Sequence, residues 1–301
     1  PFKTWKYCEE NFSKGVNIRP QFAGRPTGLL FSLESSIHPF VAHPSFREIA
    51  DLPLEEKVQR MKDPEFKKQI LSEDSSFGEG RNLKLAKRLI SSFETQFPMD
   101  EIPNYEPKIE DSIAGIAKST GKSELEVAYE EMLKNDGKTF IYACFAPYPN
   151  HTLDFYKTII EFNSSVAGLS DGGAHCGLIC DASMPTWNVT HWTRDRDRGE
   201  KIPIEYIVNK QTRETARTFG LFDRGELKEG YLADINIINY DDLKVYKPEM
   251  VHDLPTGGRR IIQKCSGYAA TIKSGVITYK NDKATGLLPG SLIRGEQSTA
   301  A

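Results

Sequence analysis

An apolar run in the second half of the chain stops abruptly at an acid and two glycines. The run covers residues 166–169, and it is followed by Ser170, Asp171, Gly172, Gly173 and, after one alanine, His175. This order places Asp171 at the C-terminal end of a strand, where parallel α/β folds carry their chemistry. The glycines would let a substrate or a metal ion come close to the backbone. We therefore expect an α/β fold with a functional site at this strand end.

Asp171 can serve several purposes at such a place. Its carboxylate could bind a metal ion, act as a general base, or do both. The alternative is a Ser-Asp-Gly turn in which the side chain only accepts hydrogen bonds from nearby amides. His175 reaches the same strand end, either as a hydrogen-bond donor to a substrate or as a pH-dependent partner. A loop histidine with a structural role is the alternative there.

Two cysteines follow this segment. Cys176 and Cys180 are spaced so that one helical turn could bring their thiols together, and with Asp171 and His175 they imitate a metal cluster. No second cysteine pair accompanies them, and a free cysteine commonly packs as a small apolar residue. The chain has 5 cysteines, an odd number that favours reduced thiols over a disulfide framework.

Arg25 follows an apolar stretch at residues 16–23. Its position just past a strand suits a guanidinium that binds a substrate carboxylate through two parallel hydrogen bonds. The alternative is a surface arginine with a helix or loop partner. An arginine-aspartate run is expected to be a solvated helix end, and four further histidines are expected to pack or to face solvent. These residues are Arg194, Arg196, Arg198, His38, His43, His151 and His191.

Charge and hydropathy narrow the class of partner. Lys and Arg number 39 against 42 Asp and Glu, so the net charge of -3 gives no attraction to nucleic acid or to an anionic membrane surface. No apolar run approaches the roughly 20 residues that cross a bilayer, and the first residues lack the apolar stretch of a secretory signal. We therefore expect a cytoplasmic chain that acts on a small soluble molecule.

The first half of the chain reads as a helix and a strand followed by an insertion. Residues 1–13 predict a helix that leads into a strand at 16–23. Residues 44–136 are polar and punctuated by proline, which is typical of a helical surface insertion. Within it, Asp63 before a proline and Ser123 before two glutamates predict helix N-termini.

The second half returns to strand, loop and helix. Strands are expected at residues 139–145 and 166–169, with short helices after them. Beyond Gly220 the pattern changes to alternating strands at 233–238 and 268–279. This change predicts a hairpin-rich sheet that is separate from the α/β part.

Several motifs together resemble one family, the metal-dependent amidohydrolases, in the branch of the D-aminoacylases and the N-acyl-D-glutamate or N-acyl-D-aspartate deacylases. Each motif alone is weak, but in combination they span most of residues 16–295. They are the segments 20–26, 168–175, 180–186, 190–195, 215–221 and 225–234.

The resemblance implies the C-terminal part of a distorted (β/α)8 TIM barrel with a helical insertion and a small β-sandwich. Residues 1–43 would supply a late barrel strand and loop, and 44–136 a lid-like insertion over the barrel mouth. Residues 137–220 would form the end of the barrel with the last catalytic strand. Residues 221–301 would form the C-terminal β-sandwich segment.

The resemblance also implies a chemistry. Zinc, as one or two ions, would activate water for hydrolysis of the amide C–N bond of an N-acyl amino acid, most closely an N-acyl-D-amino acid. Asp171 would contact the metal and take the water proton, passing it to the leaving nitrogen. Arg25 or His175 would orient the substrate, with Gly172 and Gly173 beside it. A homo-oligomer is compatible with this reading.

The chain departs from the family in its histidines. It has no His-x-His, the pair that holds the metal on the first barrel strand of such enzymes. We therefore expect the N-terminal barrel portion to be missing from this chain, which alone would be inactive and hold no zinc. Two other functions stay open: a cyclic-amide hydrolase or deaminase of the same superfamily, and a non-catalytic scaffold that keeps the fold.

Overall fold

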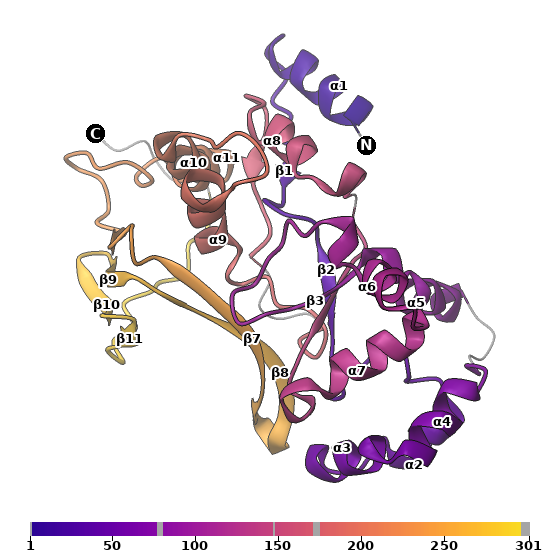
Figure 1. Ribbon diagram of the computed structural model, residues 1–301. Helices are drawn as coiled ribbons and strands as arrows, with labels where there is room; N and C mark the ends of the chain where they lie inside the picture. The colour runs from indigo at the N-terminus through magenta and orange to yellow at the C-terminus, as the bar shows by residue number, and fades with distance from the viewer. Residues whose placement is uncertain (1, 77–80, 147, 171–174, 296–301) are drawn as a thin grey trace.

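The computed structural model describes residues 2–76, 81–146, 148–170 and 175–295, and it confirms a mixed α/β fold (Figure 1). The helices are α1 (Phe2–Phe12), α2 (Pro44–Ile49), α3 (Leu54–Lys62), α4 (Pro64–Ser72), α5 (Arg81–Ser91), η1 (Phe93–Thr95), η2 (Ile109–Asp111), α6 (Ile113–Thr120), α7 (Glu124–Gly137), η3 (Pro149–His151), α8 (Asp154–Ile160), α9 (Met184–Thr190), the π-helical η4 (His191–Asp195), α10 (Ile204–Gln211), α11 (Arg213–Thr218) and η5 (Pro255–Gly257). The strands are β1 (Gln21–Phe22), β2 (Gly28–Phe31), β3 (Gln96–Pro98), β4 (Ile141–Cys144), β5 (Val166–Ala167), β6 (Ile235–Ile238), β7 (Lys244–Leu254), β8 (Gly258–Ser266), β9 (Tyr268–Lys273), β10 (Val276–Lys280) and β11 (Lys283–Ala284).

Two short strands form the parallel part of the fold. β1 pairs with β5 in parallel, with Gln21 opposite Val166 and Phe22 opposite Ala167. One further backbone bond, from the Gly168 amide to the Phe22 carbonyl at 2.9 Å, extends the pairing past both strands. Because the strands are parallel, the chain segments that leave them start from the same edge. The predicted strands before Arg25 and before Asp171 are thus neighbours.

A second sheet is antiparallel, in the order β2-β4-β3. We predicted the strand at residues 139–145 as part of the barrel end, but its strand β4 pairs with β2 and β3 and contacts neither β1 nor β5 in a ladder. Alternate side chains explain this arrangement, because the sheet separates two apolar cores. Leu29, Phe31, Ile141 and Ala143 enter the core under α2–α7, whereas Leu30, Phe97, Tyr142 and Cys144 enter the core under α8 and α9.

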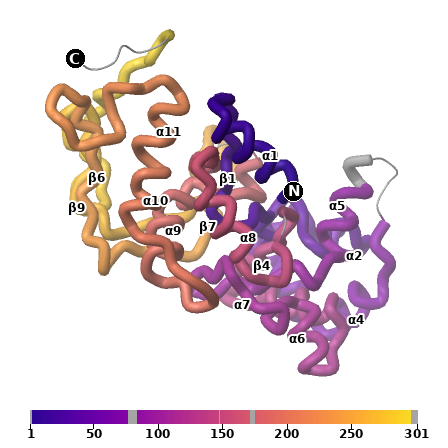
Figure 2. Tube along the Cα trace, turned by 90° about the horizontal axis from the view of Figure 1, so that it is seen from above, coloured from indigo at the N-terminus to yellow at the C-terminus, as the bar shows by residue number. Residues whose placement is uncertain are grey.

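The helical insertion forms where its caps predict. Asp63 accepts hydrogen bonds from the amides of Glu65 and Phe66 at the start of α4, and Ser123 accepts one from Glu126 at the start of α7. Both predicted N-termini are confirmed. The helices of this insertion occupy one side of the molecule, and α10 and α11 lie with the C-terminal sheet on the other (Figure 2).

The C-terminal region is rich in hairpins, as predicted, and it contains two sheets. One is four-stranded, in the order β11-β10-β9-β6, and the other is the long antiparallel ribbon β7-β8. The ribbon crosses the molecule toward the helical insertion (Figure 1). It is tied to the α/β part by the Ile261 amide, which donates to the Cys176 carbonyl at 2.7 Å.

Across the described residues, every helix is too short or too polar to span a lipid bilayer.

The core under α2–α7 gives a stability prediction. Phe40 is fully buried, and its ring meets the ring of Tyr129 edge-on at 5.3 Å between centroids. Phe40→Ala should lower the free energy of unfolding by about 3–5 kcal/mol, because it removes apolar contacts and leaves a cavity. Denaturant titration measures this loss. Leu227→Ala is the control, since Leu227 is 87% exposed and its loss should change stability by less than about 0.5 kcal/mol. Equal effects of the two substitutions would contradict the packing.

Candidate functional site

The strand-end loop that carries the predicted carboxylate is described only at its two sides. Asp171, Gly172 and Gly173 lie outside the described residues. Before them, the exposed Ser170 donates from its hydroxyl to the Ala182 carbonyl at 3.4 Å. After them, the exposed His175 has a φ of 52°, and its carbonyl accepts from the amides of Leu178 and Ile179. The turn that starts at His175 is therefore fixed by backbone bonds.

Arg25 lies three residues past β1, at the edge shared with β5, and the structure buries it. The residue is 1% exposed. Its Nη2 donates to Asp181 Oδ1 at 3.1 Å and to the Cys180 carbonyl at 3.4 Å. Its Nε and Nη1 form no hydrogen bond within the described part of the chain. Asp181 thus occupies Nη2, one of the guanidinium nitrogens that we predicted would bind a substrate carboxylate. The substrate-binding role of Arg25 stays a prediction.

Aromatic rings enclose the guanidinium. Its central carbon lies 3.4 Å from the ring centre of Tyr105 and 5.9 Å from that of Trp187. Burial lowers the pKa of Arg25, but the interactions with Tyr105 and Asp181 outweigh burial and raise it. The arginine is therefore permanently charged, and the ring face replaces water on its unpaired side. Tyr105 is itself held by Gln263 of β8, whose Nε2 donates to the Tyr105 hydroxyl at 2.9 Å.

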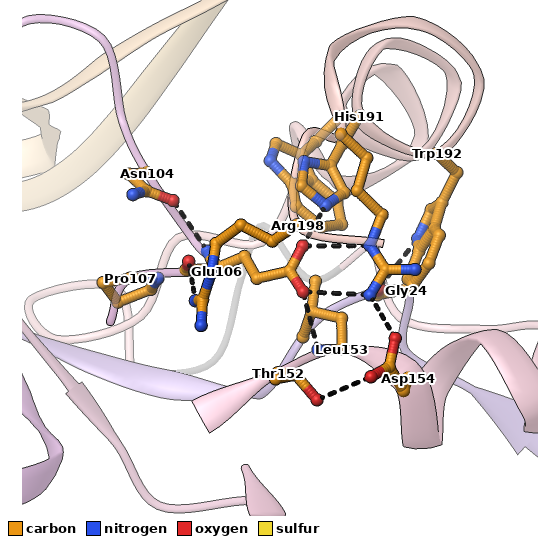
Figure 3. A network of polar contacts seen from close by, with 12 residues as sticks. Gly24, Asn104, Glu106, Pro107, Thr152, Leu153, Asp154, His191, Trp192 and Arg198 are labelled. Carbon is orange, nitrogen blue, oxygen red and sulfur yellow. Dashed lines mark hydrogen bonds and ion pairs between the residues drawn. The ribbon is translucent and has the colours of Figure 1, made fainter. Parts of the chain in front are cut away.

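The turn before Arg25 is clamped by the helix that follows α9. The Trp192 indole donates to the Gly24 carbonyl at 2.9 Å (Figure 3). A Cβ at Gly24 would lie 1.5 Å from Asn188 Oδ1, so this close approach requires glycine. α9 and η4 therefore fix the path of the chain as it leaves β1 toward Arg25.

The clamp rests on a buried cluster around Glu106, which lies between β3 and η2 (Figure 3). Glu106 Oε1 accepts from Arg196 Nη2 at 3.0 Å and from the Leu153 amide at 2.8 Å. Its Oε2 accepts from Arg196 Nε at 3.1 Å and meets His191 Nε2 at 3.0 Å. Arg196 Nη2 also pairs with Asp154 at 2.7 Å. Both carboxylate oxygens are thus fully engaged.

This cluster corrects our interpretation of the arginine-aspartate run. Arg196 was expected in a solvated helix end, but it is 1% exposed and pairs with Glu106 in two parallel hydrogen bonds. Arg198, its neighbour in the run, donates to the Glu106 carbonyl at 2.6 Å. The sequence alternation of arginine and aspartate carries no signal for these contacts, because Glu106 is 90 positions away from Arg196.

The π-helical turn of η4 explains how His191 and Arg196 reach the same carboxylate. Its wider winding follows α9 directly, and a π-turn is a known feature of functional or strained helix segments. The His191 ring stacks on the Trp187 ring at 4.3 Å with an interplanar angle of 13°. His191 was expected to pack or to face solvent, and it packs with a charged partner.

The described residues do not fit a metal ion by themselves. They contain no group of three or more His, Cys, Asp or Glu side chains placed to hold one. Cys176 contacts the Arg259 carbonyl at 3.8 Å, while burial raises the pKa of Cys180 to about 11. The structure therefore gives no support to a zinc site built on the two cysteines.

Residues 143–279, which include the segment around Asp171, match the model of the amidohydrolase family. The chain is a distant match to the amidohydrolase superfamily. No curated protein matches the chain.

Three solved structures to which the chain is similar are of D-aminoacylases. They are a variant in complex with copper chloride at 19% identity, the enzyme said to define a novel subset of amidohydrolases at 22%, and a structure that addresses the binuclear metal center at 21%. Each has a TM-score of 0.34, and the match covers 64% of this chain and 36% of the other. The chain thus spans little more than a third of the length of these neighbours.

The Glu106 cluster predicts how stability depends on pH. Burial raises the pKa of Glu106, but hydrogen bonds from His191 and Arg196 outweigh burial and lower it to about 2. A lowered pKa gives stability that is complete above the unfolded value, near 4.5, and is lost as the pH falls toward 2. The difference corresponds to roughly 3 kcal/mol.

Unfolding free energies of the wild type and of Glu106→Gln, measured from pH 6 down to about pH 2, test this dependence. The wild type should lose more stability than the variant over that interval, because glutamine has no proton to bind. The variant should already be less stable at neutral pH, since Arg196 then lacks its buried counter-charge. Glu124→Gln, at an exposed position, should follow the wild-type curve. Parallel curves for wild type and Glu106→Gln would contradict the assignment.

Proposed function

We propose that this chain is part of a hydrolase of amide C–N bonds that removes the acyl group from N-acyl-D-amino acids. The observation that carries the proposal is the match of residues 143–279 to the amidohydrolase family. That segment contains Asp171, Gly172, Gly173 and His175, the residues for which the sequence predicts a site. The D-aminoacylases among the similar structures supply the substrate class.

The parallel pairing of β1 with β5 supports a functional site at the C-terminal edge of barrel strands. We propose that the two strands are the last two of a distorted (β/α)8 barrel, and that the C-terminal sheets belong to a β-sandwich. Gly168 still pairs with the Phe22 carbonyl, so Asp171 follows only three residues after the last ladder bond. The helical insertion of residues 44–136 would lie over the same edge.

The proposed reaction adds water to the acyl carbon and breaks the C–N bond. Asp171 takes a proton from the water as it attacks and returns it to the leaving nitrogen, so that a carboxylic acid and a free amino acid are released. His175 orients the substrate, and Gly172 and Gly173 leave room for it. Arg25, buried against Asp181 and Tyr105, would hold the strand-end turn in place beneath the substrate.

Asp171 is the one residue of this chain that we propose as a contact to the metal ion of such an enzyme. The described residues offer no ligand set, so no step is assigned to an ion held by them. Zinc, if bound in the intact protein, needs further ligands outside the described residues, with Asp171 as one contact. When bound, zinc would supply a polarised carbonyl and an activated water.

The test is hydrolysis of N-acetyl-D-methionine and its L enantiomer by the intact protein that contains this chain, assayed with added zinc. We expect hydrolysis of the D form. Asp171→Asn should lower kcat by about 100-fold or more, since it removes the proton acceptor. Asp51→Asn is the control, because Asp51 is exposed and lies in the insertion. A near-normal kcat for Asp171→Asn would sink the assignment, and absence of hydrolysis of any N-acyl amino acid would contradict the function.

A further inference from the structure

A groove of about 520 Å³ opens between α5, the end of β4 and the turn after His175. Its size falls within the range of small-molecule sites, about 300–1,000 Å³. Leu29 and Leu178 form its buried floor. The Leu30 amide donates to the Leu178 carbonyl at 2.8 Å, which fixes the floor to β2. The groove thus has a rigid, apolar base.

Two large apolar side chains that line the groove are exposed to solvent. Leu85 of α5 is 57% exposed and Phe145, directly after β4, is 50% exposed. Both side chains line the same groove as Leu29 and Leu178, so the exposed apolar area adjoins the buried floor. A concave apolar patch of this kind marks a binding site more often than a scattered surface leucine does.

One side chain in the described lining of the groove is a permanent cation. Arg88 of α5 is exposed, and no described residue pairs with its guanidinium. His175 belongs to the same lining, and the described lining contains no carboxylate. An unpaired arginine beside an apolar surface suits a ligand that has a carboxylate at one end and an apolar chain at the other.

We propose that this groove binds an N-acyl amino acid whose acyl chain is of medium length, with the chain on Leu29 and Leu178 and the carboxylate on Arg88. This inference rests on the proposed function and names its preferred substrate. The length follows from the groove, whose volume and apolar lining exceed what an acetyl group fills. The amide of such a ligand would lie between the floor and Arg88, on the side of His175.

The experiment is calorimetric titration of the full chain with N-octanoylglycine, N-acetylglycine and octyl glucoside. Octanoylglycine should bind about 100-fold more tightly than acetylglycine, because six further methylene groups are partly buried. Octyl glucoside, which has no carboxylate, should bind more weakly than octanoylglycine. Equal binding of the two glycine derivatives, or no binding of octanoylglycine, would overturn the proposal.

Variants separate the two ends of the ligand. Arg88→Gln should weaken octanoylglycine about tenfold and leave octyl glucoside unchanged, since only the charged hydrogen bond is lost. Lys87→Gln removes the same charge from the neighbouring position on α5 and should change neither. Leu85→Ser and Phe145→Ser should weaken both octyl ligands. Equal effects of the substitutions at Arg88 and Lys87 would overturn the carboxylate site.

The outcome is independent of the hydrolysis assay. If the intact protein hydrolyses N-acetyl-D-amino acids while octanoylglycine fails to bind this chain, the groove assignment fails and the proposed function stands. If octanoylglycine binds with the predicted Arg88 dependence while no N-acyl amino acid is hydrolysed, the groove stands and the proposed function fails. Unchanged thermal unfolding of each variant shows that its fold is intact.

Discussion

The buried contact between Glu106 and Arg196 joins three parts of the chain that lie far apart in the sequence. Glu106 comes from the long connection after β3, Arg196 from the end of η4, and the Leu153 amide from the start of α8. A buried ion pair is not in itself stabilising, because desolvation offsets most of the attraction. Its effect here is geometric: two parallel hydrogen bonds accept only one relative placement of the two segments.

A short series of contacts connects the Glu106–Arg196 pair to the turn that carries Arg25. η4 carries Trp192 as well as His191, and Trp192 holds the Gly24 carbonyl. The next residue is Arg25, whose guanidinium lies on Tyr105, and Tyr105 is the residue before Glu106. The segment around Glu106 therefore supports the strand-end turn in two ways, indirectly through Trp192 of η4 and directly through Tyr105. A displaced Glu106 would shift both.

Local signals in the sequence predicted much of the fold. The N-caps at Asp63 and Ser123 depend on the side chain and on amides two or three positions away, so they are visible in the sequence. The strand before Arg25 and the strand before Asp171 were also expected, and the structure pairs them in parallel. β4 was placed in the wrong sheet, because a short apolar run has the same appearance whether its neighbours are parallel or antiparallel.

The ion pairs between residues far apart in the chain could not be predicted from the sequence. Arg25 was identified as a candidate binding residue, but its partner Asp181 is 156 positions away and could not be inferred from spacing. Arg196 resembled a solvated residue because its neighbours are charged, and only the fold shows that Glu106 faces it. The candidate site is thus predicted in position at the strand ends, whereas the contacts that hold Arg25 come from the structure alone.

A double-mutant cycle on Glu106→Gln and Arg196→Met tests the central interaction most directly, with unfolding free energies as the readout. Each single substitution leaves a buried charge or donor without its partner, at a cost of about 3–5 kcal/mol. The double variant removes both, so it should be more stable than the sum of the single losses predicts, by at least about 1.5 kcal/mol. Additivity to within about 0.5 kcal/mol would contradict the account.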